Sequence, residues 1–441
     1  MVNTLELTTE YLRHLVRFDT SNPPGNELPC AEYIADVLRA EGMEAQVFEP
    51  EPSRGSAVCR LRGDGSQGPV LLMSHIDVVP ADASEWMHPP FAAEIHDGYM
   101  WGRGSIDTKV LTAAEMATMV TLKREGVALR RDIILAATAD EEKGGHKGMG
   151  WLAENHFDAI AAEYALNEGG GFGIDMDGRR VYLCQTGQKG SCWLKLTAHG
   201  PTGHTAAVSG PNSVAKLCAA VTRLAQAKLP QHRTKSVEQM VHDLGRLKGF
   251  PASVLLPLAL HPAFEGLILN RSAMSGTIGS ILKATLHNTA KATVLRAGEQ
   301  VNVSPPEAVA YVDGRLVPGQ TSEDLIGEIR PYIGDEIAVE IELEAPGFES
   351  GYASALYEVF GEVLRAHDPG AALVPFLVPG GTDGHHVAGK GIKVYGFNPL
   401  RAEPNWPMIQ LAHAPNERIS LANVEFCSTV LLDVVRRFCA R

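Results

Sequence analysis

The sequence lacks a long apolar run, a C-x-x-C cysteine pair and any excess of basic residues. No stretch of about 18 uncharged apolar residues occurs, so we expect no membrane-spanning helix. The 39 Lys and Arg residues are outnumbered by 52 Asp and Glu residues, and the formal net charge is −13. This acidic balance argues against nucleic acid or an anionic membrane as the main partner.

The seven cysteines are scattered along the chain, and their number is odd. This usage is typical of reduced thiols in a cytosolic protein and does not suggest a disulfide framework. Residues 1–20 include Glu6, Glu10, Arg13 and Arg17, and they show neither the apolar core nor the cleavage site of a signal peptide. We therefore expect a cytoplasmic protein.

With 441 residues, of which 45% are apolar, the chain is globular and too long for one ordinary core. Residues 70–79, 132–138 and 163–167 are mostly apolar runs that end in polar or acidic residues, as buried parallel strands do. Helical periodicity at 28–41 and 110–123 alternates with them. This order predicts an α/β domain with a mostly parallel sheet, whose functional residues gather beyond the carboxyl ends of the strands.

The pattern changes near Ser191, where polar alternation replaces the buried runs. Strands are expected at 191–198, 289–295, 309–312 and 337–343, and helices at 212–227 and 321–333. Residues 229–269 have helical character interrupted by prolines and form an elaboration. We predict that residues 189–345 form a smaller α+β domain, inserted between residues 1–188 and 346–441 of the catalytic domain.

The segment Ser74-His75-Ile76-Asp77 ends the first buried run. Residues two apart on a strand face the same side, so His75 can bind a metal ion while Asp77 holds its other ring N–H. An ordinary polar strand end fits the same residues, and the segment alone does not decide between the two interpretations.

A glycine-rich segment, Gly102-Arg103-Gly104-Ser105-Ile106-Asp107, precedes the helix expected at 110–123. Glycines let the backbone approach a metal ion closely. A carboxylate such as that of Asp107 can bridge two cations about 3.5–4 Å apart. Asp is also a favoured helix N-cap, which is the simpler interpretation of this residue taken alone.

Acidic residues also end the second and third buried runs. Adjacent Glu141 and Glu142 are costly beside a buried strand unless one binds metal and the other acts as a general base. Mixed His and carboxylate ligation without Cys favours zinc, with cobalt or manganese as substitutes. The five candidate ligands, in sequence order, are His75, Asp107, Glu142, Glu168 and His413.

At these residues the chain resembles the aminoacylase and carboxypeptidase family of zinc metallohydrolases. That family includes succinyl-diaminopimelate desuccinylase, acetylornithine deacetylase, glutamate carboxypeptidases and carnosinase-type dipeptidases. The likeness covers nearly the whole chain and rests on the ordered segments SHIDVVP, WGRGSIDTK, ADEEKGG, NEGG, HGPTGHTA, VDGRLVPG, PGGTDGHH and AHAPNE. It implies a zinc-hydrolase domain split by a lid or dimerisation domain, and a homodimer.

The resemblance also implies how the metal ligands are shared. Asp107 would bridge two zinc ions. The other four ligands would divide into two pairs, Glu142 with His413 and His75 with Glu168.

Further roles follow from the same resemblance. Glu141 would be the general base, and Asp77 would orient the neighbouring ligand histidine. His204 would stabilise the tetrahedral intermediate, often from the partner subunit, although a surface-loop histidine fits this position too. For Arg315 a structural ion-pair partner and a substrate ligand are equally good interpretations. The groups implied to hold a substrate carboxylate are Arg315, Gly381 and Thr382.

Together these features predict hydrolysis of an amide or peptide bond in a small carboxylate-bearing substrate, by a water activated between two zinc ions. The substrate would be an N-acyl amino acid, a dipeptide or the C-terminal residue of a short peptide. A zinc aminopeptidase with a similar ligand order is one alternative, although such enzymes usually lack a large inserted domain. The other is a non-catalytic metal- or small-molecule-binding protein on the same scaffold.

Overall fold

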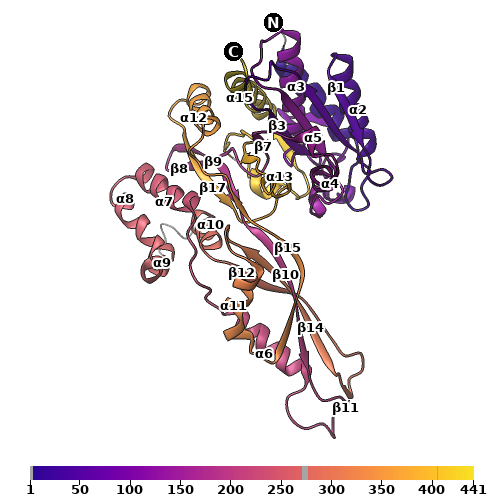
Figure 1. The fold of residues 1–441 in the computed structure, drawn as a ribbon, viewed down its shortest axis with the longest axis vertical. Helices are drawn as coiled ribbons and strands as arrows, with labels where there is room; N and C mark the ends of the chain where they lie inside the picture. The colour runs from indigo at the N-terminus through magenta and orange to yellow at the C-terminus, as the bar shows by residue number, and fades with distance from the viewer. Residues whose placement is uncertain (1–2, 271–276, 405) are drawn as a thin grey trace. The chain divides into compact units, whose positions relative to one another are not determined.

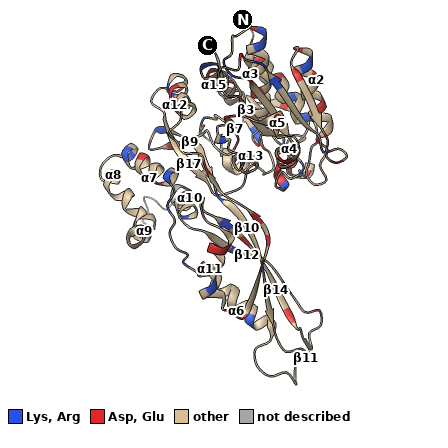
Figure 2. Ribbon diagram, in the orientation of Figure 1, with Lys and Arg blue, Asp and Glu red and all other residues tan. Residues whose placement is uncertain are grey.

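The computed structural model describes residues 3–270, 277–404 and 406–441. The chain forms two compact units. The first contains residues 1–186, 350–376 and 382–441, and the second contains residues 187–349 and 377–381. Within the described residues, no helix is both long and apolar enough to cross a membrane. Basic and acidic residues are interspersed along the elements of both units (Figure 2).

The first unit is built on a central sheet with four parallel strands in its middle. In spatial order the strands are β1 (Glu44–Phe48), β2 (Ser56–Leu61), β6 (Ile133–Thr138), β3 (Val70–His75), β7 (Tyr164–Asn167), β18 (Lys393–Gly396) and β9 (Arg179–Gln188). The pairs β6–β3, β3–β7 and β7–β18 are parallel, and the outer pairs are antiparallel. The predicted α/β fold with a mainly parallel central sheet is confirmed. Consequently β3, β6 and β7 deliver their carboxyl ends to one edge.

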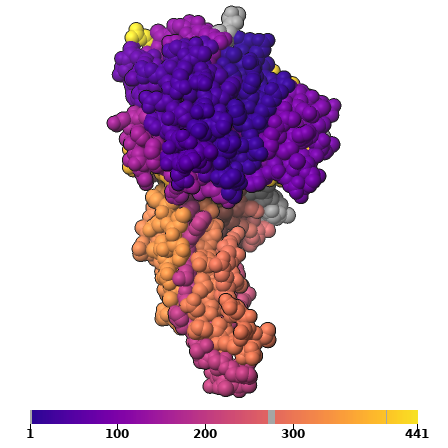
Figure 3. Space-filling model, turned by 90° about the vertical axis from the view of Figure 1, so that its right-hand side faces the viewer, coloured from indigo at the N-terminus to yellow at the C-terminus, as the bar shows by residue number. Residues whose placement is uncertain are grey.

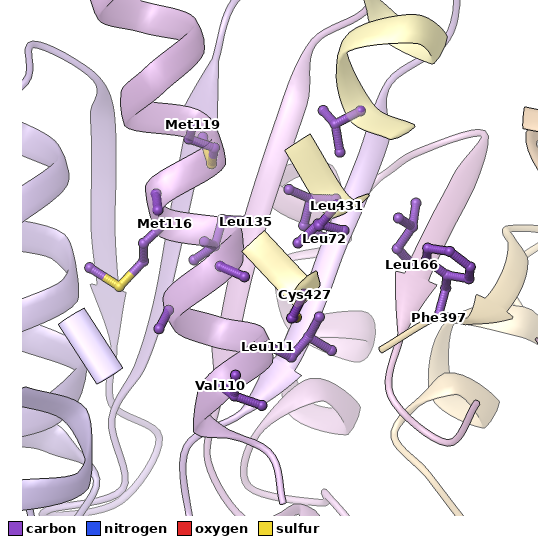
Figure 4. Packing of buried hydrophobic residues seen from close by; sticks show 14 of the residues in the cluster. Leu72, Val110, Leu111, Met116, Met119, Leu135, Leu166, Phe397, Cys427 and Leu431 are labelled. Atoms are coloured by element: carbon purple, nitrogen blue, oxygen red, sulfur yellow. The ribbon is translucent and has the colours of Figure 1, made fainter. Parts of the chain in front are cut away.

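Helices pack around this sheet (Figure 1). They are α1 (Thr4–Arg17), α2 (Leu28–Ala40), α3 (Lys109–Arg124), α4 (Met149–Asn155), α5 (Phe157–Ile160), α12 (Ala355–His367), α13 (Gly384–Ala388), α14 (Met408–Leu411) and α15 (Leu421–Cys439). Helix α3 is buried from Lys109 to Leu122, because α1, α15 and the sheet all contact it. Figure 4 shows side chains of α3 and α15, among them Leu111 and Leu431, gathered beside Leu72 of β3. Each such leucine stabilises the fold by about 1.5–3 kcal/mol.

The second unit contains an antiparallel sheet with helices packed on it. Its strands, in spatial order, are β12 (Thr289–Ala297), β14 (Glu307–Leu316), β10 (Gly190–His199) and β15 (Ile337–Ala345). Buried side chains alternate along β14, and the buried face packs with α6 (Ser213–Ala225) and α11 (Ser322–Ile333). The expected elaboration at 229–269 contains α7 (Lys235–Lys248), α8 (Ala252–Leu255) and α9 (Pro262–Leu269), and α10 (Thr277–Leu286) follows it.

A short two-stranded sheet lies at one end of the second unit. It pairs β11 (Gly203–His204) with β13 (Val303–Ser304). Within this unit it lies at the opposite end from α8 and α9 (Figure 1), and the magenta segment at the lower end of Figure 3 belongs to the same region of the chain. Near the end of this unit, strand β16 (Phe348–Glu349) pairs with the last residues of β9.

Two features of the first unit differ from the expectation. Strand β3 ends at His75 and does not continue to residue 79, because Val78 leaves the sheet and exchanges backbone hydrogen bonds with Thr20 and Asn22. The hairpin β8 (Phe172–Met176)–β9 and strand β17 (Ala372–Val378) were not expected. The turn Asp177-Gly178, with positive φ at both residues, was a sequence signal for that hairpin.

Candidate metal centre

Three of the parallel strands deliver candidate ligands to the same edge of the sheet. His75 is the last residue of β3, and Glu168 directly follows β7. Glu141 and Glu142 lie in a short 3₁₀ helix just after β6. Because the strands are parallel neighbours, side chains separated by up to about a hundred positions in the sequence meet at one place.

The other two candidate ligands lie in segments that flank a small sheet made of β4 (Glu94–His96), β5 (Tyr99–Trp101) and β19 (Arg418–Ser420). Asp107 lies between β5 and α3, and His413 precedes β19. Strand β19 pairs with β5 in antiparallel register. This pairing brings His413 next to Asp107 although they are far apart in the sequence.

Asp107 stands between two histidines and faces each with a different carboxylate oxygen. Its Oδ1 lies 3.2 Å from His75 Nε2, and its Oδ2 lies 3.0 Å from His413 Nε2. Glu142 Oε1 is 3.1 Å from the same His413 nitrogen. His75 Nε2 also lies 4.0 Å from a carboxylate oxygen of Glu141 and 4.0 Å from one of Glu168.

The ligand atoms therefore form two groups, each compact enough for one ion. One group contains His75, Glu141 and Glu168, and the other contains Asp107, Glu142 and His413. All five ligands expected from the sequence, and the expected base, lie in these two groups. The arrangement is asymmetric in its access to solvent, because the His75 side chain is 1% exposed and the His413 side chain is 52% exposed.

The centre concentrates negative charge in a buried place. Burial raises the pKa of Glu168 to about 8, with a further contribution from the charge of Asp107. Burial and the charge of Glu168 likewise hold the pKa of Glu141 well above its usual range. Burial also raises the pKa of nearby Asp383 to about 7. Crowded carboxyl groups of this kind are costly without a compensating cation.

Asp77 contacts His75 less directly than expected. The closest partner of His75 Nδ1 is the backbone carbonyl of Asp77 at 2.9 Å, whereas the Asp77 carboxylate lies 3.5 Å away. That carboxylate accepts the backbone N–H groups of Glu141 at 3.1 Å and Glu142 at 3.2 Å, and the side-chain amide of Asn22 at 2.9 Å. Asp77 therefore positions the acidic turn as well as the histidine.

Glu417 was given no role from the sequence, although it ends the segment AHAPNE. It is fully buried, and Arg103 donates to its carboxylate at 2.7 Å. The same carboxylate accepts backbone N–H groups of Gly104, Ile106 and Asp107. Glu417 thus fixes the conformation of the loop that presents Asp107. Nothing in the local sequence distinguished it from an exposed turn residue.

The other predicted site residues lie in separate surroundings. Arg315, in β14, contacts Asp313 and donates to Ser191 Oγ at 3.0 Å, and a Cβ at Gly381 would lie 3.9 Å from its Nη1. Thr382 is 5% exposed, and its hydroxyl accepts Asn167 Nδ2 at 2.9 Å. His204, in β11, is exposed, and its ring accepts the backbone N–H of Ala206 at 3.2 Å.

Comparison with known proteins agrees with this arrangement. The sequence profile described as "Peptidase family M20/M25/M40" matches residues 71–437. The N-fatty-acyl-amino acid synthase/hydrolase PM20D1 of Xenopus tropicalis is 29% identical over 421 residues, which are 92% of this chain and 79% of that protein.

Solved structures share the fold. The M20 family metallo-carboxypeptidase Sso-CP2 from Sulfolobus solfataricus superposes with a TM-score of 0.70 at 18% identity, covering 99% of each chain. The YXEP protein of Bacillus subtilis, described as a dinuclear metal binding peptidase, gives a TM-score of 0.62 at 12% identity, covering 99% of this chain and 98% of that one.

Proposed function

The chain belongs to peptidase family M20/M25/M40 and is a metal-dependent hydrolase of amide bonds, and we propose that it cleaves N-acyl amino acids with two zinc ions. The observation that carries the two-ion proposal is Asp107, which directs one carboxylate oxygen to His75 and the other to His413. Membership of this family also argues against a non-catalytic binding protein.

The side chains fit a pair of divalent cations. The ligand atoms are nitrogens and carboxylate oxygens, the set that zinc takes when no cysteine is present. Glu142 Oε1 is buried and accepts no hydrogen bond of normal geometry within the described residues. His75 and Glu168 would hold one ion, Glu142 and His413 the other, and Asp107 both. Cobalt or manganese would be workable substitutes.

When bound, the metal pair would polarise the scissile carbonyl and lower the pKa of the attacking water. Glu141 stands beside His75 and Glu168, and its side chain is only 14% exposed. Its carboxylate would accept the proton of the water as the new C–O bond forms. It would then give that proton to the amine nitrogen as the C–N bond breaks. A base positioned in this way typically accelerates a reaction by about 10²–10⁴-fold.

The inserted unit would act as a lid and dimerisation domain. We propose a homodimer in which His204 donates a hydrogen bond to the developing oxyanion, a contribution of about 2.7–4 kcal/mol. Arg315 and the adjacent Gly381, with Thr382, would bind the substrate carboxylate. If His204 acts across subunits, an equal mixture of inactive Glu141→Gln and His204→Ala chains should recover about a quarter of the wild-type activity, because half of the dimers are mixed and each has one intact site. If no activity returns, His204 acts within its own subunit.

N-acyl amino acids come first among the substrates because the Xenopus relative is named as a hydrolase of N-fatty-acyl amino acids. A dipeptide or a peptide C-terminus is the second candidate, since the Sulfolobus protein of the same fold is named a carboxypeptidase. Both candidates carry a free carboxylate next to the scissile amide.

A hydrolysis screen tests the substrate. The zinc-loaded protein is given N-acyl amino acids with short and long acyl chains, dipeptides, peptides with a blocked N-terminus, and aminoacyl amides that lack a carboxylate. We expect the highest kcat/KM on N-acyl amino acids and a loss of at least tenfold on their methyl esters. Preference for aminoacyl amides would instead identify a zinc aminopeptidase.

A further inference from the structure

A second cluster of metal-ligating side chains lies on the β4 hairpin and the loop before it. His96 Nε2 lies 2.8 Å from Glu94 Oε2. His88 Nδ1 lies 3.4 Å from the same oxygen. The two imidazole rings stack, with centroids 3.9 Å apart and planes 13° apart. None of the three residues belongs to the centre that contains Asp107.

The separations match the span of ligands around one small cation. Zinc binds imidazole nitrogen and carboxylate oxygen at about 2.0–2.2 Å, so two ligand atoms at a tetrahedral angle are about 3.4 Å apart. One nitrogen from each histidine and one carboxylate oxygen all lie within 4.8 Å of one another. Because the two rings are nearly parallel and each nitrogen binds a metal in its own ring plane, one ring must turn out of the stack before both nitrogens and the oxygen can face a shared ion.

The side chains are held in place yet open to solvent. The side chains of His88, Glu94 and His96 are 24%, 44% and 42% exposed, so an ion can enter without unfolding the hairpin. Strand β4 pairs with β5. The His88 ring packs edge-on against Trp101 of β5, with the two ring centroids 4.7 Å apart. The pairing and the ring contact reduce the entropy lost when the ligands converge on an ion.

We propose that His88, Glu94 and His96 form a third metal site, which takes one late first-row transition-metal ion such as Zn²⁺ or Cu²⁺. Two imidazoles and one carboxylate leave a fourth position for water. The site carries one carboxylate, compared with several at the Asp107 centre, so it fills after that centre and binds more weakly. Cu²⁺ binds it more tightly than Zn²⁺ because imidazole-rich sites follow that order of affinity.

The site is joined to the loop that carries His413. The backbone N–H of Met87, next to His88, donates to Asn416 Oδ1 at 2.7 Å. Pro90 O accepts the backbone N–H of Arg103 at 2.9 Å, and Arg103 in turn donates to His413 O at 3.2 Å. An ion on His88 would therefore bind beside the segment that supports the Asp107 centre, without sharing a ligand with it.

Copper titration followed by electron paramagnetic resonance tests the proposal. One equivalent of Cu²⁺ is added to full-length protein already loaded with two equivalents of Zn²⁺. At the third site the copper signal shows coupling to two imidazole nitrogens. Copper that displaced zinc from the other centre would couple to one, because each of its ligand groups contains a single histidine.

Three variants make the result decisive. His88→Gln and His96→Gln each remove one imidazole. We therefore expect each variant to lose the two-nitrogen signal and to bind the third metal ion at least tenfold more weakly. The matched control is His242→Gln, which alters an exposed histidine of α7 outside every candidate ligand group. This variant should keep the two-nitrogen signal and the wild-type affinity for the third ion. Circular dichroism verifies that all three variants are folded. An unchanged two-nitrogen signal in His96→Gln, or a one-nitrogen signal in wild type, overturns the proposal.

Discussion

The backbone N–H of Glu141 donates to Asp77 Oδ1 at 3.1 Å. This bond links the second residue after β3 to the first residue of the 3₁₀ turn after β6. The neighbouring N–H of Glu142 donates to the other carboxylate oxygen at 3.2 Å. The position of the proposed base therefore depends on a side chain that is itself fully buried.

Replacing Asp77 with Asn should lower kcat by about 10–100-fold, the range for groups that support metal ligands. Asn keeps the shape but has one acceptor oxygen, so one of the two backbone N–H groups would face an amide N–H. KM should change little, because Asp77 does not reach the substrate. Asp82→Asn is the matched control, since Asp82 caps an exposed turn. Equal kcat for both variants would contradict the positioning role of Asp77.

Replacing Glu141 with Gln should reduce kcat by about 10²–10⁴, the usual contribution of a general base. The amide has nearly the same size as the carboxylate but cannot accept and return a proton. Zinc content, measured by mass spectrometry, should stay at two ions per chain. Glu154→Gln, on the exposed side of α4, controls for the loss of one charge. A Glu141→Gln enzyme with wild-type turnover would exclude this residue as the base.

Zinc counting separates the roles of Asp107 and His413. Asp107→Ala should lose both ions, because its two oxygens face the two histidines. His413→Ala should lose one, since the group around His75 keeps its own nitrogen and carboxylates. Each variant should also have a lower Tm than the loaded wild type, because bound ions stabilise the folded state. Retention of one ion with wild-type affinity by Asp107→Ala would show that Asp107 does not bridge.

Glu115 makes stability depend on pH. It lies on α3, fully buried, where Ser74 donates to it at 2.7 Å, and burial raises its pKa to about 8. Below about pH 4.5 the carboxyl is protonated in both the folded and the unfolded chain. Between about pH 4.5 and 8 only the unfolded chain ionises, so the free energy of unfolding falls as pH rises, by about 1.4 kcal/mol per pH unit.

Glu115→Gln removes this dependence, because an amide does not titrate in that range. We expect the free energy of unfolding to fall less between pH 5 and 8 in the variant than in wild type, by an amount on the order of a few kcal/mol. Urea unfolding at both pH values, with equal zinc loading, measures it. Parallel pH profiles for wild type and Glu115→Gln would mean that Glu115 is already ionised in the folded protein.

Local patterns in the sequence were enough to predict the sheet and the ligand types. The runs that became β3, β6 and β7 are mostly apolar, as strands buried on both faces are. Strand β3 ends at His75, and candidate metal ligands follow shortly after β6 and β7. Parallel pairing then requires those ends to meet. The hairpin β8–β9 was missed because β9 begins with the exposed pair Arg179-Arg180 and is then buried without interruption, so it lacks the alternation typical of a hairpin strand.

Only the tertiary structure decided which side chains touch. His413 reaches Asp107 because β19 pairs with β5, a long-range choice that no local spacing encodes. Glu417 holds the Asp107 loop from inside the core, and Asp77 directs its carboxylate mainly to backbone N–H groups of the next turn. The sequence determined which groups were available for metal chemistry. Their distances, burial and hydrogen-bond partners arise from contacts between segments far apart in the chain, and those depend on how the whole unit packs.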